Sequence, residues 1–394
     1  MADSGAAGDG SWAGRAGIAG AAIGVVAAGA AAGIALERLT VGRGIRRKAR
    51  MALDAASPYG ALHAAPATVR AEDGTELHYE VEEVADHAEP APAPLHRRVF
   101  SRKGPPPLTV VFCHGYCLNQ DAWHFQRLAL RGRLRTVYWD QRSHGRSGRG
   151  PAGAPVTIEQ LGRDLRAVLD AAVPEGPVVL VGHSMGGMTV MALAAEYPDY
   201  VTERVAGVAF VGTSAGGLEQ VDFGLPLAGM RAVRRLVPGV LKALGSSQVT
   251  TDLVERGRRA TADLFAGLIK RYSFDSLDVD PALARFAERL IESTPIDVVA
   301  DFYPALLAHD KTAELAAFAG IPALVLVGEK DLVTPASHSE VIAAQLPDAE
   351  HVVVPEAGHL VLLERPEAVQ EALSALLERA ATPTGQATKG RQRL

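Results

Sequence analysis

A serine flanked by glycines stands between two apolar segments of the sequence. Residues 182–186 read Gly-His-Ser-Met-Gly. The apolar run 176–181 predicts a buried strand before this motif, and residues 188–197, rich in Ala, Met and Leu, predict a helix after it. A serine in a G-x-S-x-G sequence at a strand-to-helix turn has its hydroxyl exposed above the end of the strand. The motif therefore predicts that Ser184 is a nucleophile.

A steric argument explains why the motif has a glycine at each end. The turn is sharp and strained, and side chains at Gly182 and Gly186 would clash with its neighbouring backbone. The serine also stands at the N-terminus of the predicted helix, which favours developing negative charge. The alternative is a solvated serine in an ordinary tight loop, but the strand before and the helix after are what the nucleophile motif requires.

A serine that attacks a carbonyl carbon needs hydrogen-bond donors for the oxyanion that forms. Residues 108–113 predict a second buried strand, which is followed by His114, Gly115 and Tyr116. Gly115 allows the backbone to approach a ligand, so we expect the N–H groups of Tyr116 and Met185 to form the oxyanion hole. Each such donor contributes roughly 3 kcal/mol in the transition state. The alternative for this His-Gly pair is a plain turn.

The catalytic base needs an acid that orients it. Residues 321–328 predict a buried strand, and Glu329 and Asp331 follow it directly. We favour Asp331 because it lies further into the loop than Glu329. Asp310 and Asp301 are weaker alternatives.

The last predicted strand, 351–354, is followed by a loop that contains His359, just past a glycine. The chain order Ser184, Asp331, His359 is the order found with the G-x-S-x-G turn. We therefore predict that His359 is the base. Three other histidines stand on the nucleophile side without a facing acid, and we interpret them as neighbours of the site: His183, His114 and His144.

Strands and helices alternate along the rest of the chain. Residues 67–72 and 75–82 alternate in polarity around residues 73–74, Asp-Gly, which predicts an antiparallel hairpin. Residues 135–139 predict another strand, and residues 157–173 predict a helix with one apolar face. Such alternation predicts a mostly parallel sheet that helices cover on both faces.

The alternation stops between residues 214 and 305. Apolar residues recur there at helical spacing, and Asp280 followed by Pro281 is typical of a helix start. We expect 214–305 to be a helical cap inserted over the strand ends, either as simple cover or to shape the substrate pocket. The recurring apolar residues are Leu253, Leu264, Leu268, Leu283, Phe286 and Leu290. Early apolar residues of the cap favour a hydrophobic acyl group: Phe223, Leu225, Leu227 and Met230.

With these segments the sequence resembles the α/β-hydrolase superfamily, and within it the branch of esterases, lipases and haloperoxidase-like enzymes. The segments that carry the resemblance are Gly-His-Ser-Met-Gly-Gly (182–187), His114-Gly115, Asp-Gln-Arg-Ser-His-Gly-Arg-Ser (140–147), and Gly358-His359 with Glu-Arg-Pro-Glu (364–367). Ser143 stands where the family pattern D-x-R-G-x-G-x-S has its first glycine. The resemblance covers residues 67–380 and implies a three-layer α/β fold with Ser-His-Asp catalysis, while it leaves the substrate open.

Residues 16–36 carry no charge. As a helix they would span about 32 Å, close to the hydrocarbon core of a bilayer, although most of them are Ala or Gly. Basic residues cluster after this segment rather than before it, which by the positive-inside rule places the following chain in the cytoplasm. We predict a single-pass transmembrane helix with a cytoplasmic catalytic domain. The alternatives are export and a soluble cytoplasmic protein with a peripheral leader.

Composition excludes several classes of function. The 394-residue chain has a formal net charge of −5, which gives no case for nucleic-acid binding. The two cysteines, Cys113 and Cys117, make no disulfide framework, and we expect Cys113 to be a small core residue. No H-E-x-x-H or C-x-x-C pattern occurs, so no metal or cofactor is expected. The expected partners are a small-molecule ester substrate, with lipid esters among the candidates, and the membrane. The oligomeric state stays open.

The sequence therefore predicts carboxylic-ester hydrolysis through an acyl-enzyme. The same triad would serve a C–C bond hydrolase, a thioesterase, an acyltransferase or a cofactor-free haloperoxidase or perhydrolase, and a catalytically silent, membrane-tethered interaction protein is a remote alternative. The predicted organisation is a disordered leader (1–15), a transmembrane helix (16–36), a basic linker (37–66), an α/β-hydrolase core (67–213 and 306–380), a helical cap (214–305) and a disordered tail (381–394).

Overall fold

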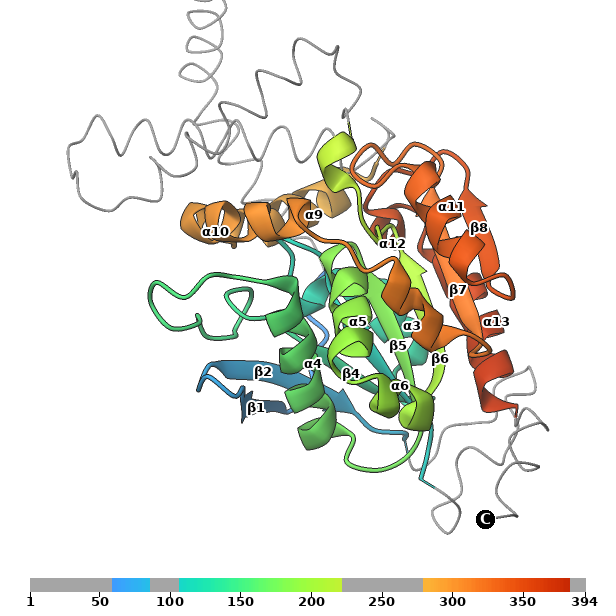
Figure 1. Ribbon diagram of the computed structural model, residues 1–394, viewed down its shortest axis with the longest axis horizontal. Helices are drawn as coiled ribbons and strands as arrows, with labels where there is room; N and C mark the ends of the chain where they lie inside the picture. Colours follow the sequence, from blue (N-terminus) through green and yellow to red (C-terminus); the bar gives the residue numbers. More distant parts are fainter. Residues whose placement is uncertain (1–58, 86–105, 222–278, 383–394) are drawn as a thin grey trace, which may run out of the picture. The chain divides into compact units, whose positions relative to one another are not determined.

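The computed structural model describes residues 59–85, 106–221 and 279–382, and these residues contain one eight-stranded sheet with helices packed against it (Figure 1). The strand order is β1-β2-β4-β3-β5-β6-β7-β8. The strands are β1 (Pro66–Arg70), β2 (Glu76–Glu82), β3 (Thr109–Cys113), β4 (Arg135–Trp139), β5 (Val178–His183), β6 (Val205–Val211), β7 (Ala323–Gly328) and β8 (Glu350–Val354). The pairs β1–β2 and β2–β4 are antiparallel, and all other pairs are parallel.

The helices follow the strands in the predicted alternation. They are α3 (His124–Leu130), α4 (Ile158–Ala172), α5 (Met185–Glu196), α6 (Pro198–Arg204), α9 (Pro281–Glu292), α10 (Ile296–Leu307), α11 (Ala336–Gln345), α12 (Val361–Glu364) and α13 (Pro366–Ala381). Short 3₁₀ turns are η1 (Gln120–Trp123), η2 (Leu218–Gln220) and η3 (Ala313–Phe318). The predicted strand 135–139 and the hairpin around residues 73–74 are confirmed. The mostly parallel sheet is confirmed as well.

The central strands are buried on both faces, because helices cover both sides of the sheet. Every residue of β3, β5 and β7 is buried. Side chains alternate along β3: Val110 and Phe112 belong to a core cluster with α3 and α13, whereas Val111 and Cys113 belong to a cluster with α4 and α5. Cys117 lies in the first cluster, and both cysteines are free and buried. Figure 1 shows α4 and α5 side by side against the sheet.

The helix starts have side-chain caps. Thr157 accepts a hydrogen bond from the backbone N–H of Gln160 at the start of α4. Asp280 accepts one from the N–H of Ala282 at the start of α9, and Pro281 occupies the first turn. Each cap satisfies an N–H group that has no partner within its helix, so the start predicted at Asp280 and Pro281 is confirmed.

The end of the predicted linker 37–66 packs against the core instead of spanning open space. The Tyr59 ring lies 5.7 Å from the ring of Phe286 on α9 and 5.4 Å from that of His124. The backbone N–H of Ala64 donates to Glu80. Aromatic contacts and this hydrogen bond hold Tyr59 and Ala64 against the core before β1 begins.

Several predictions fall outside the described residues. They are the leader (1–15), the apolar span (16–36), most of the tail (381–394), and the part of the cap that includes Phe223, Leu225, Leu227, Met230, Leu253, Leu264 and Leu268. Among the helices of 59–85, 106–221 and 279–382, none combines the length and apolar character needed to cross a bilayer. The membrane span at 16–36 stays a prediction from sequence. Of the predicted cap, the structure describes 214–221 and 279–305, including α9 and most of α10.

Candidate active site

Ser184 occupies a strained turn between β5 and α5. Its backbone angles are φ 53° and ψ −122°, outside the regions that a serine normally adopts. A Cβ atom at Gly182 would lie 2.5 Å from the backbone oxygen of Gly186, and a Cβ atom at Gly186 would overlap the backbone oxygen of Cys113. The turn can therefore form only with glycine at both flanking positions, which raises the Ser184 side chain above the C-terminal end of β5.

The three residues predicted as a triad lie in hydrogen-bond contact. The Nε2 atom of His359 is 3.0 Å from the Oγ atom of Ser184, and its Nδ1 atom is 2.8 Å from the Oδ2 atom of Asp331. Asp331 follows β7, and His359 lies in the loop between β8 and α12. All three residues are buried, and Ser184 and His359 keep 8% and 7% of their surface exposed.

Asp331 is fixed in its loop by hydrogen bonds. Its Oδ1 atom accepts from the N–H groups of Val333 and Thr334, and its Oδ2 atom accepts from the Thr334 hydroxyl. Burial alone would raise the pKa of Asp331, but the charge and hydrogen bond of His359 and the bonds from Thr334 lower it overall. The carboxyl group is therefore held as an anion that faces the imidazole. The part played by Thr334 escaped the sequence analysis, although a Thr three residues after an Asp is a local turn signal.

The alternative acids do not approach His359 in this way. Glu329 is exposed and accepts a hydrogen bond from the N–H of Glu356. Asp301 is exposed on α10, and Asp310 accepts from the N–H of Thr312. Of the four acids considered, the structure brings only Asp331 into hydrogen-bond contact with His359.

The other histidines near the serine are buried and hydrogen-bonded elsewhere. The Nε2 atom of His183 is 3.0 Å from the backbone oxygen of His359, and the Nδ1 atom of His144 bonds the backbone oxygen of Arg142. Burial lowers the pKa of His183 and of His144 to about 3 each. It lowers the pKa of His114 to about 4. These imidazoles are neutral at physiological pH and hold loops in place.

The loop that carries the predicted oxyanion donors lies directly against the serine. A Cβ atom at Gly115 would lie 2.7 Å from the Nδ1 atom of His183 and 3.1 Å from the Cβ atom of Ser184. Only a glycine fits there, as the sequence analysis expected of a close backbone approach. Tyr116 follows this glycine, and Met185 begins α5 immediately after the serine.

A polar network that the sequence analysis missed supports this loop. The side-chain amide of Gln141 donates to the backbone oxygen of His114, and the Gln141 N–H donates to the Nε2 atom of the same histidine. The hydroxyl of Thr189 donates in turn to the side-chain oxygen of Gln141. The network fixes the peptide plane of His114 relative to α5. No local sequence pattern predicts this network, because its three residues come from three separate segments.

The loop after β4 contains a residue in a conformation that favours glycine. Ser143 has φ 64° and stands where the family pattern has glycine. Before it in the chain, Asp140 accepts from the N–H groups of Gln120 and Arg146, and Arg142 forms a buried ion pair with Asp164. These bonds hold the loop in a shape that a side chain at position 143 opposes.

We expect Ser143→Gly to raise the free energy of unfolding by about 0.5–1 kcal/mol, because glycine relieves the left-handed strain but makes the unfolded chain more flexible. Urea unfolding of both proteins measures the difference. Ser374→Gly, within α13, is the control and should lower stability by about 1 kcal/mol. A variant at position 143 that loses as much stability as the control contradicts the strain argument.

Apolar side chains from α10 pack beside the nucleophile turn. Val298, Phe302 and Leu306 form a cluster with Met185 and Met188 of α5. The start of α5 is therefore covered by hydrocarbon on the side of the described cap.

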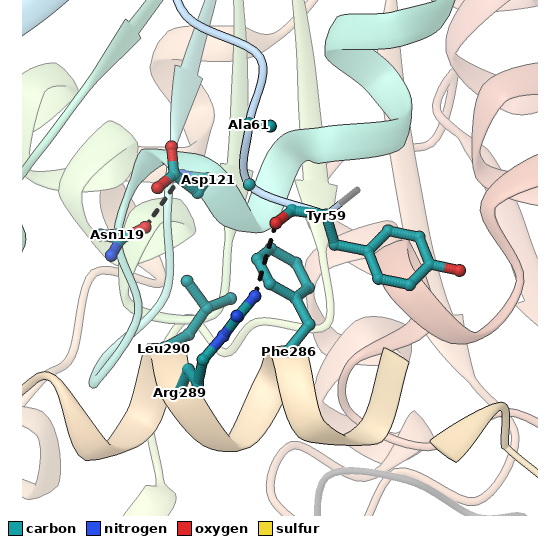
Figure 2. Close-up of a pocket in the computed structure, with 8 residues that line it drawn as sticks. Tyr59, Ala61, Asn119, Asp121, Phe286, Arg289 and Leu290 are labelled. Atoms are coloured by element: carbon teal, nitrogen blue, oxygen red, sulfur yellow. Dashed lines mark hydrogen bonds between the residues drawn. The ribbon is translucent and has the colours of Figure 1, made fainter. Parts of the chain in front are cut away.

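A separate hollow of about 340 Å³ lies between the segment after residue 58 and α9. Figure 2 shows Phe286, Arg289 and Leu290 on one side of it, and Tyr59 and Asp121 on the other. It contains none of the predicted site residues, so the candidate site remains the one at Ser184. Within 59–85, 106–221 and 279–382, no group of three or more His, Cys, Asp or Glu residues is placed to hold a metal ion.

Several known proteins are similar to this chain in sequence. Residues 109–366 match the family model of the α/β hydrolase fold. The mouse sn-1-specific diacylglycerol lipase ABHD11 is 28% identical over 299 residues, which cover 74% of this chain and 88% of the lipase. The 3-oxoadipate enol-lactonase 2 of Acinetobacter baylyi is 26% identical and covers 72% of this chain and 93% of its own length.

Among solved structures, a thermophilic esterase from Thermogutta terrifontis matches with a TM-score of 0.60 and 26% identity, over 81% of this chain and 100% of the esterase. The family match spans more than half of the sequence and includes all three residues of the predicted triad. The chain therefore belongs to the α/β-hydrolase fold family and is an enzyme of the serine hydrolase type.

Proposed function

We propose that the protein hydrolyses carboxylic esters at Ser184. The observation that carries this proposal is the continuous hydrogen-bonded line from Ser184 through His359 to Asp331. In this mechanism the Oγ atom attacks the ester carbonyl carbon while the Nε2 atom of His359 accepts its proton. His359 then gives that proton to the leaving alcohol, and an acyl-enzyme remains.

Asp331 has an orienting role in this proposal. Its anionic Oδ2 atom accepts a hydrogen bond from the Nδ1–H of His359, which keeps Nε2 free to accept the serine proton. The lowered pKa of Asp331 favours the charged state that stabilises the imidazolium as it forms. A water molecule activated by the same histidine then attacks the acyl-enzyme, and the serine is restored.

Two backbone N–H groups are proposed to bind the oxyanion, those of Tyr116 and Met185. The glycine before Tyr116 brings that part of the loop against the serine, and Met185 follows the serine at the N-terminus of α5. Fixed N–H groups stabilise the charge that develops in the transition state without having to reorient during the reaction.

The substrate is proposed to carry a hydrophobic acyl group. The apolar surroundings of the nucleophile turn support this preference, since Val298, Phe302 and Leu306 pack against the start of α5. The relatives support the ester bond as the target, since a diacylglycerol lipase, an enol-lactonase and an esterase are among them.

A fluorophosphonate probe followed by an ester panel tests the proposal. We expect the probe to modify Ser184, as located by peptide mass spectrometry, and p-nitrophenyl esters to be hydrolysed faster as the acyl chain lengthens from acetate. Thioesters, C–C bond substrates and peracid formation are assayed in parallel, because the same triad serves those reactions. A folded protein that the probe does not label would overturn the proposal, and a flat chain-length profile would remove the hydrophobic preference.

A further inference from the structure

The side chain of Tyr116 makes contacts that the backbone role proposed for this residue does not require. Its hydroxyl donates a hydrogen bond to the backbone oxygen of Val299, 2.5 Å away. Its ring stacks on that of Phe302 with 6.3 Å between the centroids. Val299 and Phe302 both belong to α10, so Tyr116 connects the loop after β3 to the described part of the cap at two points.

The ring of Tyr116 is confined by its aromatic neighbours. Phe302 is fully buried and meets the ring of His144 edge-on, with 4.9 Å between the centroids. The His144 ring lies 6.1 Å from that of Tyr116. The three rings come from three different segments, and two of them contact the Tyr116 ring. These contacts favour the ring position in which the hydroxyl bonds the carbonyl of Val299.

The hydroxyl also remains a donor at all working pH values. Burial raises the pKa of Tyr116 well above its ordinary value, so the group stays protonated. On the other side of Gly115, the Gln141 amide holds the backbone oxygen of His114. The carbonyl oxygen of Gly115 shares a peptide plane with the Tyr116 N–H, and it lies 2.8 Å from the Nδ1 atom of His114 and accepts a hydrogen bond from the N–H of Leu118. The Tyr116 side chain adds a second support on the other side of this plane, through its bond to α10.

We propose that the Tyr116 hydroxyl is a positioning group, which holds the Tyr116 N–H toward the oxyanion by tying the loop after β3 to α10. This inference rests on the proposed function. The position of α10 then sets the strength of transition-state stabilisation as well as the shape of the pocket.

Tyr116→Phe tests the tie, because it removes the hydroxyl and keeps the stacked ring. Tyr59→Phe is the matched control, since it also keeps the ring and removes a hydroxyl that bonds a cap residue, Asp280 at the start of α9. The assays are steady-state hydrolysis of a p-nitrophenyl ester and amide hydrogen exchange of peptides that cover residues 113–119. Thermal melting confirms that both variants are folded.

For Tyr116→Phe we expect kcat to fall about tenfold with KM changed by less than about twofold, because a misplaced donor weakens the transition state more than the ground state. Exchange in 113–119 should become faster. The control, Tyr59→Phe, should keep kcat and KM within about twofold of the values of the native protein. An unchanged kcat, or unchanged exchange, in Tyr116→Phe overturns the positioning role while the proposed function stands. Absence of ester turnover in the native protein, with Ser184 unlabelled, refutes the proposed function and this inference together.

Discussion

Replacing Ser184 with alanine is expected to lower kcat for a p-nitrophenyl ester by about 10⁵-fold or more. The change removes the Oγ atom that lies 3.0 Å from the Nε2 atom of His359, so no acyl-enzyme forms. The proposed oxyanion donors are backbone groups and survive the substitution. We therefore expect a residual rate about 10³-fold above that of the uncatalysed reaction. Initial rates of the purified native and variant proteins over a range of substrate concentrations give kcat for each, and a sample without enzyme gives the uncatalysed rate.

Ser374→Ala is the control for this experiment. Ser374 lies on α13, where its hydroxyl donates to the backbone oxygen of Gln370, and it has no contact with the triad. Its kcat should stay within about twofold of the native value. A Ser184→Ala protein that keeps more than about 1% of the native kcat would contradict the nucleophile assignment.

Acidification is expected to destabilise the fold by several kcal/mol before most carboxylates titrate. Burial lowers the pKa of four histidines to about 3 or 4: His114, His144, His183 and His309. In the unfolded chain each has a pKa of about 6.5, so below that pH the unfolded state binds protons that the folded state does not. Stability therefore falls as the pH decreases from 7, by about 2 kcal/mol per histidine between pH 7 and pH 5.

Carboxyl groups whose pKa burial raises act in the opposite direction. Burial raises the pKa of Asp121 to about 6 and also raises the pKa of Asp140 and of Asp164. At Asp121 the folded state takes up a proton between pH 7 and pH 5 and recovers about 1 kcal/mol. Urea unfolding at several pH values and constant ionic strength measures the sum. His309→Gln, which keeps a donor for the backbone oxygen of Ser214, should reduce the pH dependence by about one quarter. If the urea midpoint of unfolding is the same at pH 5 and at pH 7, the buried histidines are not held neutral by the fold.

The sequence analysis identified the parts of the site that have local signals. The glycines around Ser184 are required by a turn of three residues, and the buried strands are continuous apolar runs whose ends carry Asp331 and His359. Such features are visible in a short window of sequence, because they follow from sterics and from burial on both faces of a sheet. Ser184, Asp331 and His359 lie at the same edge of the sheet because the strands that precede them are parallel.

Other parts of the site depend on contacts between distant segments. Gln141 meets His114 and Thr189 only after β3, β4 and α5 have packed, and the Tyr116 hydroxyl meets α10 across 183 positions of the chain. The packing of Tyr59 on α9 is similar, since it joins residues more than two hundred positions apart. Nothing in the local composition distinguishes these residues from others of their type. Their roles follow from geometry that a single sequence does not specify.

We expect neither of the two cysteines to act as a nucleophile beside Ser184. Burial raises the pKa of both thiols to about 12, so neither forms the thiolate that alkylating agents and peroxide attack. The thiols also belong to core clusters on opposite faces of the sheet, which keeps them apart. We therefore do not expect either thiol to compete with Ser184 for an electrophilic inhibitor.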